Sequence, residues 1–241
     1  MPPGNVTEDY YIKHIEFTPD GESIVCTSRN RLCTSNANSL ELESSMVLED
    51  LFEKEGSAGL GNDVPVLTLS PSGEHAAMAG YVSNGAVMTV WRLKTGAKSQ
   101  TIRWPGRRVW ALSISPDSLE IALGFEDGVV RLRRLADVED VIWERKVHNQ
   151  EVFALQFHPD GSRLFTGGRD KTIWILETSS GTAIRNLRGH EDYVWSLAIS
   201  ADGKRLVSSS GDKTVRIWET WPYSRRIQAI EKAKRAAKSE R

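Results

Sequence analysis

The sequence predicts an all-β protein, a β-propeller of about five four-stranded blades. A recurring sequence motif, its period and the amino-acid composition of its strands predict this fold. The clearest copy of the motif runs from Val194 to Gly203 and reads Val-Trp-Ser-Leu-Ala-Ile-Ser-Ala-Asp-Gly. Four further copies close at residues 21, 73, 118 and 161, so the closing positions lie 52, 45, 43 and 42 residues apart. A propeller blade takes about 40–45 residues, and this period therefore favours a propeller over a sandwich or a barrel.

Each copy predicts the same order of elements. An apolar alternating strand comes first and ends in a turn, which reads His-Pro-Asp-Gly at residues 158–161. Proline presets the backbone of such a turn and glycine accepts the positive φ at its end, where the third copy has Ser118 instead. A second strand at 205–209, a tight turn at 211–212 and a third strand at 214–218 follow in the last copy. These runs are rich in β-branched and aromatic residues, as strands are.

The repeats divide the chain into a propeller region, 1–223, and a basic tail, 224–241, which has strong helix propensity. The glycine-rich segment 56–63 is expected to be a loop. The acidic stretch 41–55 is either an outer strand followed by a loop or a short helix. We expect the five blades at about 10–62, 63–104, 105–146, 147–188 and 189–223.

The fifth repeat lacks a fourth strand, because Thr220 is followed by Trp-Pro and then by the tail. The short polar stretch from Asn5 to Tyr10 is the one N-terminal segment that could complete it. We therefore expect either a tight five-bladed ring or an open arc, and we favour the arc. An open arc would expose edge strands and an apolar blade face, which invites self-association.

Residues 188–220 resemble a WD repeat, with Gly-His at the start, Asp-Gly at the first turn and Trp218 at the close. The resemblance implies a buried hydrogen-bonded tetrad of His190, Ser208, Asp212 and Trp218. A buried Asp needs donors, and a buried imidazole or indole N–H needs an acceptor. Satisfied together, the four side chains would pin the second and third strands of the blade to the first.

The resemblance weakens toward the N-terminus. The fourth repeat has His148, Thr166 and Asp170 at the tetrad positions but Leu176 in the place of the Trp. The third repeat retains only Asp127, with Pro105 and Arg133 at the His and Trp places, the second retains only Trp91, and the first has none of the set.

Three groups of residues have the types of a catalytic or ligand site, and each has a simpler explanation. The tetrad contains a Ser, a His and an Asp, but the blade already accounts for them as buried structural groups. Cys26, Cys33 and His14 lack zinc spacing and a fourth ligand. The glycines at 56–61 precede a strand, whereas a phosphate loop precedes a helix. We therefore expect no catalytic residues, no metal site and no cofactor.

Aromatic residues occupy equivalent positions in three successive first strands. They either line the mouth of the central channel or stack between adjacent blades. Charged and aromatic residues precede them, so this rim is the first place where we expect a peptide to bind. The candidate partner-binding rim consists of Arg107, Arg108, Trp110, Glu151, Phe153, Arg169, Tyr193 and Trp195.

The composition places the chain among ordinary globular proteins. The net charge is −1, which gives the whole chain no affinity for polyanions, and two cysteines make no disulfide framework. The N-terminus has no signal-peptide pattern, and no apolar run of about 18 residues could span a membrane. A cytoplasmic protein with no membrane contact is the expectation.

The resemblance to WD-repeat scaffolds implies a non-enzymatic protein that presents its rim and loops to protein or peptide partners. The basic tail leaves an alternative open, because residues 225–241 contain seven Lys or Arg and two Glu. It is a solvated terminal helix, a helix docked on the open blade or a partner, or a contact for nucleic acid. Clustered charge without stacking aromatics is a weak signal, so nucleic acid is not the favoured partner. A nucleic-acid-associated or assembly factor and a regulatory module of a larger enzyme complex are the alternative functions.

Overall fold

The computed structural model describes residues 14–28, 31–47, 66–82 and 85–220, and these residues form 19 β-strands and no helix. The predicted all-β class is therefore confirmed. The expected helix at 224–241, the loop at 56–63 and the stretch from Asn5 to Tyr10 lie outside the described residues.

The strands form five antiparallel sheets, each a meander in chain order, which we number as blades 1 to 5. Blade 1 contains β1 (His14–Phe17), β2 (Ser23–Ser28), β3 (Arg31–Asn36) and β4 (Leu42–Val47). Blade 2 contains β5 (Val66–Leu69), β6 (His75–Val82), β7 (Gly85–Arg92) and β8 (Ala97–Pro105). Blade 3 contains β9 (Val109–Ile114), β10 (Glu120–Phe125), β11 (Val129–Arg134) and β12 (Val141–Lys146). Blade 4 contains β13 (Val152–Phe157), β14 (Arg163–Gly168), β15 (Ile173–Glu177) and β16 (Ala183–Leu187), and blade 5 contains β17 (Val194–Ile199), β18 (Arg205–Ser210) and β19 (Val215–Glu219).

The first turn of every blade ends in a residue with left-handed backbone, at the place where the repeat predicts a glycine. These residues are Gly21, Gly73, Ser118, Gly161 and Gly203, with φ between 62° and 75°. Ser118 adopts the strained conformation too, and its hydroxyl accepts a hydrogen bond from the backbone N–H of Ser72 in blade 2 at 3.0 Å. An interblade hydrogen bond therefore accompanies the strain at this position.

The core lies between the blades. We call the face that a blade turns toward the next blade its forward face, and the opposite face its backward face. Between blades 4 and 5, Phe165 and Ile175 on the forward face pack with Leu197 and Leu206 on the backward face of the next blade, and all four are buried. The same arrangement of apolar faces joins blades 1 and 2, 2 and 3, and 3 and 4. Since a single sheet cannot cover its own apolar faces, stacking of neighbours stabilises every blade.

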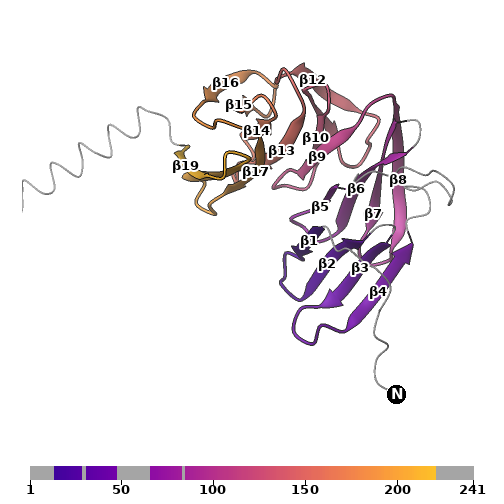
Figure 1. The fold of residues 1–241 in the computed structure, drawn as a ribbon. Helices are drawn as coiled ribbons and strands as arrows, with labels where there is room; N and C mark the ends of the chain where they lie inside the picture. Colours follow the sequence, from indigo (N-terminus) through magenta and orange to yellow (C-terminus); the bar gives the residue numbers. More distant parts are fainter. Residues whose placement is uncertain (1–13, 29–30, 48–65, 83–84, 221–241) are drawn as a thin grey trace, which may run out of the picture.

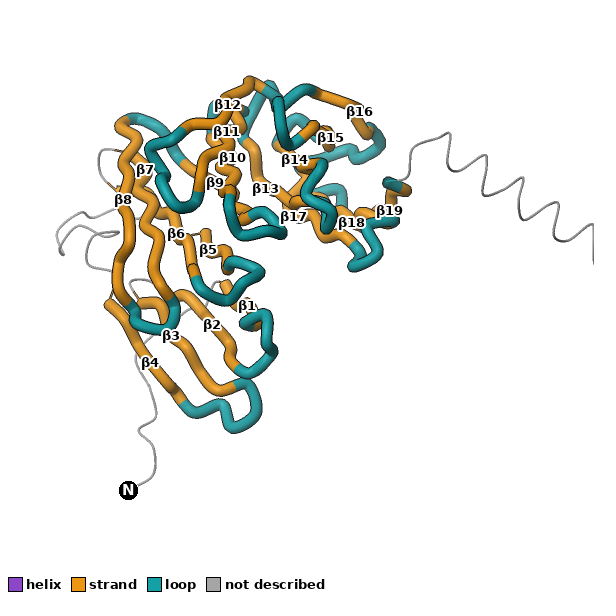
Figure 2. Tube along the Cα trace, turned by 180° about the vertical axis from the view of Figure 1, so that it is seen from behind, coloured by secondary structure: helices purple, strands orange, loops and turns teal. Residues whose placement is uncertain are grey.

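The five sheets follow one another in an open arc (Figures 1 and 2). The inner strands contact each other in the order β1, β5, β9, β13 and β17, and blades 1 and 5 lie at the two ends of the arc (Figure 1). Blade 5 has three strands among the described residues. Of the two expected arrangements, the open arc is the one observed, and Leu42–Val47 forms the outer strand that was one expectation for the acidic stretch.

Candidate functional site

In blade 5, the four side chains that the resemblance implies form one chain of hydrogen bonds. The indole Nε1–H of Trp218 donates to Ser208 Oγ at 2.8 Å, and Ser208 Oγ lies 2.7 Å from His190 Nε2. His190 Nδ1 lies 2.8 Å from a carboxylate oxygen of Asp212. With Nδ1 protonated, each donor in the chain meets an acceptor. The His190 and Ser208 side chains are buried, so this chain joins strands and offers no nucleophile to solvent.

Blade 4 contains the same arrangement without the indole. His148 Nδ1 lies 2.9 Å from Asp170 Oδ1, and His148 Nε2 lies 2.7 Å from Thr166 Oγ1. Burial would raise the pKa of Asp170, but the hydrogen bonds from His148 and Thr172 outweigh it and lower the pKa to about 2. Leu176 fills the place of the Trp and is fully buried in the core between blades 3 and 4.

In blade 3, Asp127 pairs with an arginine instead of a histidine. Arg107 lies 3.4 Å from Asp127 and 3.8 Å from Glu144, and Arg131 Nε donates to Glu144 at 2.7 Å. Both guanidinium groups lie over the ring of Phe125, at 5.7 and 5.1 Å from its centroid. Arg107, which the sequence assigns to the partner-binding rim, is thus engaged in a network within its own blade.

Arg133 occupies the place of the tetrad Trp in blade 3. It is 5% exposed, donates to the carbonyl of Val138 and lies 5.6 Å over the ring of Trp104. A guanidinium therefore replaces the indole as the buried donor, although it bonds to a loop rather than to the second strand.

The four aromatic residues of the candidate rim form one continuous cluster across blades 3, 4 and 5, which we call the aromatic ladder. Trp110 meets Phe153 edge to face at 5.7 Å, and Phe153 stacks on Trp195 at 4.6 Å. Tyr193 contacts both Phe153 and Trp195, at 6.1 and 5.8 Å. The rings stack between blades, as one expectation had it, but Trp195 still exposes 50% of its surface. The ladder therefore combines closely packed rings with an exposed aromatic side chain.

Charged side chains border the ladder in pairs. Arg169 forms an ion pair with Glu151 at 2.6 Å and lies 5.0 Å over the ring of Tyr193. Arg108 lies apart from these groups, 4.1 Å over the ring of Tyr81 in blade 2. Six of the eight rim residues are thus brought together, whereas Arg107 and Arg108 contact Phe125 and Tyr81. The repeat pattern marks neither ring, and each is identified only by the arginine that lies over it in the fold.

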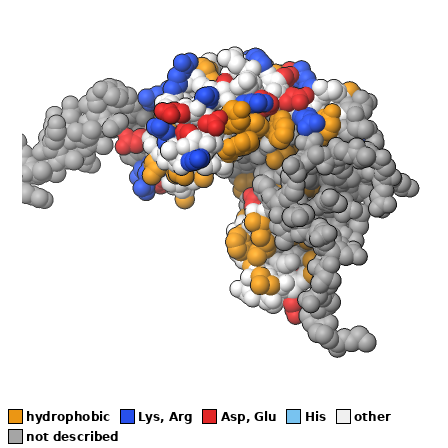
Figure 3. Space-filling model, viewed as in Figure 1, with side chains coloured by type: hydrophobic (Ala, Val, Ile, Leu, Met, Phe, Trp, Pro, Cys, Tyr) orange, Lys and Arg blue, Asp and Glu red, His pale blue; other side chains and the backbone are white. Residues whose placement is uncertain are grey.

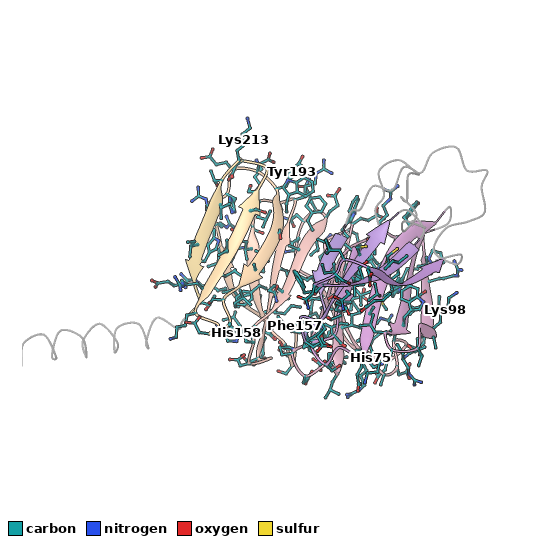
Figure 4. All side chains as sticks on the ribbon, turned by 90° about the horizontal axis from the view of Figure 1, so that it is seen from below. His75, Lys98, Phe157, His158, Tyr193 and Lys213 are labelled. Atoms are coloured by element: carbon teal, nitrogen blue, oxygen red, sulfur yellow. The ribbon has the colours of Figure 1, made fainter. Side chains whose placement is uncertain are left out.

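Figure 3 shows hydrophobic surface gathered where blades 3 and 4 meet, and a second hydrophobic area on the sheet of blade 1. Figure 4 places Tyr193 and Lys213 at one end of the blades and His158 and His75 at the other. His158 is buried at that far end, and its Nε2 lies 3.0 Å from the carbonyl of Gly203 in blade 5. The ladder and the His158 contact therefore occupy opposite ends of the arc's blades.

Among the described residues, no group of three His, Cys, Asp or Glu side chains is placed to hold a metal ion. Cys26 and Cys33 form no disulfide and lie opposite each other in the register of β2 and β3. No helix in the described part of the chain is long and apolar enough to cross a membrane.

Two family models match the chain. Residues 181–219 match the family described as WD domain, G-beta repeat, and residues 112–198 match the anaphase-promoting complex subunit 4 WD40 domain. Together these segments cover blades 3 to 5 almost completely, where the tetrad residues are most numerous. The more divergent first two blades lie outside both matches.

Relatives share parts of the chain at modest identity. NET1-associated nuclear protein 1 of Saccharomyces cerevisiae is 34% identical over 95 residues, 39% of this chain and 10% of that protein. The U3 small nucleolar RNA-associated protein 4 homolog of Homo sapiens is 27% identical over 84 residues, 34% of this chain and 12% of that protein. The putative guanine nucleotide-exchange factor SED4 of Candida glabrata is 23% identical over 188 residues, 73% of this chain and 17% of that protein. The matched segments thus span less than a fifth of each relative.

Proposed function

The chain is a WD-repeat β-propeller protein, and we propose that it is a non-catalytic scaffold that binds a protein or peptide partner across the aromatic ladder. The general part of the proposal, a non-catalytic scaffold, follows from the family, because WD-repeat propellers are in general non-catalytic scaffolds. The ladder is the observation that supports the specific part. It joins three blades through packed rings and still leaves Trp195 half exposed.

The physical properties of the ladder suit a binding anchor. Large aromatic side chains dominate the energetics of interfaces when they are held rigidly and can be desolvated by a partner. Phe153 and Tyr193 hold the Trp195 ring from two sides, so little conformational entropy is lost when a partner covers it. Because Arg169 and Glu151 already neutralise each other, the exposed surface favours an apolar or aromatic side chain of the partner.

The test compares partner capture by the full chain and two variants. Trp195→Ala removes the exposed rung, and Ile184→Ala removes a side chain of similar exposure, 57%, from the outer strand β16 of blade 4. We expect Trp195→Ala to lose a partner that the wild type and Ile184→Ala retain, with a loss of about 2 kcal/mol or roughly thirtyfold in affinity. If both variants retain every partner of the wild type, the ladder is not the binding surface.

The names of two relatives favour a second candidate, a nucleic-acid-associated or assembly factor. One is named as nuclear and the other as associated with a small nucleolar RNA. These names give no support to the expected cytoplasmic location and suggest the nucleus, which imaging of a fluorescent fusion tests. RNA binding that falls with salt and disappears on deletion of residues 224–241 supports this candidate, and salt-independent or absent binding counts against it.

Self-association through the open ends of the arc is the remaining part of the proposal. It concerns surfaces other than the ladder, and it is testable separately from it.

A further inference from the structure

The forward face of blade 5 exposes apolar side chains at positions that blades 2 to 4 bury. Ile175 in blade 4 and Ile217 in blade 5 occupy the same register position, opposite Phe165 and Val207. Ile175 is 5% exposed because blade 5 covers it, whereas Ile217 is 67% exposed. Val215 beside it is also 67% exposed. This face therefore has the apolar character of an interblade surface and no blade against it in the described chain.

The backward face of blade 1 also exposes apolar side chains. The position of Ile15 corresponds to Leu67, Leu112, Leu155 and Leu197 in the other blades, which are 3–9% exposed, and Ile15 is 64% exposed. Phe17 is 62% exposed, whereas its counterpart in blade 4, Phe157, is 2% exposed. Blade 1 thus exposes apolar side chains on its backward face at positions where blade 4 buries its own.

A recurring hydrogen bond shows how a forward face engages the next blade. In three successive interfaces a side chain donates to the same backbone carbonyl of the following blade, the one just after its third strand. The bonds are Gln100 Nε2 to Leu135 at 3.1 Å, Trp143 Nε1 to Thr178 at 2.6 Å, and Arg163 Nη1 to Thr220 at 2.6 Å.

The two end faces retain both halves of the bond that Arg163 makes, in which the donor lies on the second strand. Arg205 of blade 5 has the strand position that Arg163 has in blade 4, since Arg163 pairs with Glu177 and Arg205 with Glu219. Ala37 of blade 1 corresponds to Thr220, because its N–H donates to the carbonyl of Glu22 at 2.8 Å as that of Thr220 donates to Lys204 at 3.0 Å. The donor position at one end of the chain and the acceptor position at the other end are therefore complementary.

We infer that this chain assembles head to tail, with the forward face of blade 5 in one copy packed on the backward face of blade 1 in a second copy. Ile217 and Val215 cover Ile15 and Phe17, and Arg205 donates to the carbonyl of Ala37. A second copy is the occupant because it supplies the same kind of backward face that already covers the forward faces of blades 1 to 4. Two different surfaces meet, so the assembly is heterologous and either closes into a ring or extends.

The experiment measures the solution mass of the full chain by light scattering across a dilution series. The variants Ile217→Asp and Phe17→Asp each place a charge on one end face, and Ile184→Asp is the matched control on an outer strand. We expect the wild type and Ile184→Asp to exceed the monomer mass, and each end-face variant alone to be a monomer. Circular dichroism melts check that the variants are folded.

Mixing the two end-face variants distinguishes this arrangement from others. Ile217→Asp retains an intact backward face and Phe17→Asp an intact forward face, so the mixture is expected to form a dimer of twice the monomer mass. A monomeric wild type, an end-face variant that still associates alone, or a mixture that stays monomeric overturns the inference. The outcome is independent of the ladder, because Ile217→Asp leaves Trp195 in place for partner capture.

Discussion

The indole Nε1 of Trp218 lies 2.8 Å from the hydroxyl oxygen of Ser208, a bond that blade 4 lacks because Leu176 stands in the place of the Trp. The bond closes a chain that runs on to His190 and Asp212. Blades 3, 4 and 5 thus hold their strands together with different numbers of tetrad members. Comparing equivalent side chains between blades therefore measures what each contact contributes.

Replacing Asp212 tests the chain of hydrogen bonds. Asp212→Ala removes the acceptor for His190 Nδ1–H and for the backbone N–H groups of Glu191 and Thr214. Because these donors are then left without a partner, we expect a clear fall in the melting temperature. Asp127→Ala in blade 3 is the matched control. Asp127 is 37% exposed and pairs with Arg107 at 3.4 Å, so its loss should cost less, about 1 kcal/mol at most. Equal losses in paired denaturation curves would contradict the assignment of Asp212 to the tetrad.

Asp170 makes the stability of blade 4 sensitive to acid. Its pKa is lowered from 3.8 to about 2 because hydrogen bonds from His148 and Thr172 outweigh the effect of burial. A carboxylate whose pKa is lower in the folded state contributes stability above its unfolded pKa and loses it as the pH falls through its folded pKa. Stability should therefore decline between about pH 4 and pH 2, by about 1 kcal/mol from this group after allowance for solvent screening. Asp170→Asn should be less stable than the wild type at neutral pH, and its free energy of unfolding should change less with pH over this window. Urea titrations at several pH values measure both effects. An unchanged acid slope in Asp170→Asn would argue against the hydrogen bonds as its origin.

Alanine substitutions at two turn glycines distinguish the cost of backbone strain from the cost of steric crowding. Gly161 and Gly203 have φ of 75° and 68°, so alanine at either position costs about 1 kcal/mol for the left-handed backbone. A Cβ at Gly161 meets nothing within 4 Å, whereas a Cβ at Gly203 meets the imidazole of His158 in blade 4. We therefore expect Gly203→Ala to be more destabilising than Gly161→Ala in thermal melts. The double variant with Gly203→Ala and His158→Ala relieves the crowding but also lacks the hydrogen bond between His158 and the Gly203 carbonyl. Comparing it with the two single variants shows whether their destabilising effects are additive. If Gly161→Ala and Gly203→Ala have equal melting temperatures, His158 does not pack on this turn as observed.

The sequence predicts most of the fold because its determinants are local. The apolar alternation, the turn residues and the period of about 43 residues set each sheet independently of its neighbours. Even the departure at Ser118 obeys this rule, since that serine takes the left-handed conformation of the glycines it replaces.

Contacts between side chains that lie far apart in the sequence, within a blade or between blades, were harder to predict. The assignment of Arg107 to the rim missed its pairing with Asp127 and Glu144, because a sequence does not show which charged neighbour lies within reach. The ladder was predicted as a set of equivalent positions, but whether its rings line a surface or stack on each other depends on the angle between blades. That angle also decides which end faces remain open.

A pair of isoleucines at equivalent positions tests whether the arc is open in solution. Ile175 and Ile217 have the same side chain and the same place in their blades, but they are 5% and 67% exposed. Ile175→Ala should cost about 2–5 kcal/mol because it removes buried methyl groups and leaves a cavity between blades 4 and 5. Ile217→Ala should change the free energy of unfolding by about 0.5 kcal/mol or less, provided that the protein is dilute enough for copies not to associate. Urea denaturation at low protein concentration measures both values. If Ile217→Ala costs as much as Ile175→Ala under these conditions, another part of the same chain covers the forward face of blade 5, and neither the open arc nor the head-to-tail contact would stand.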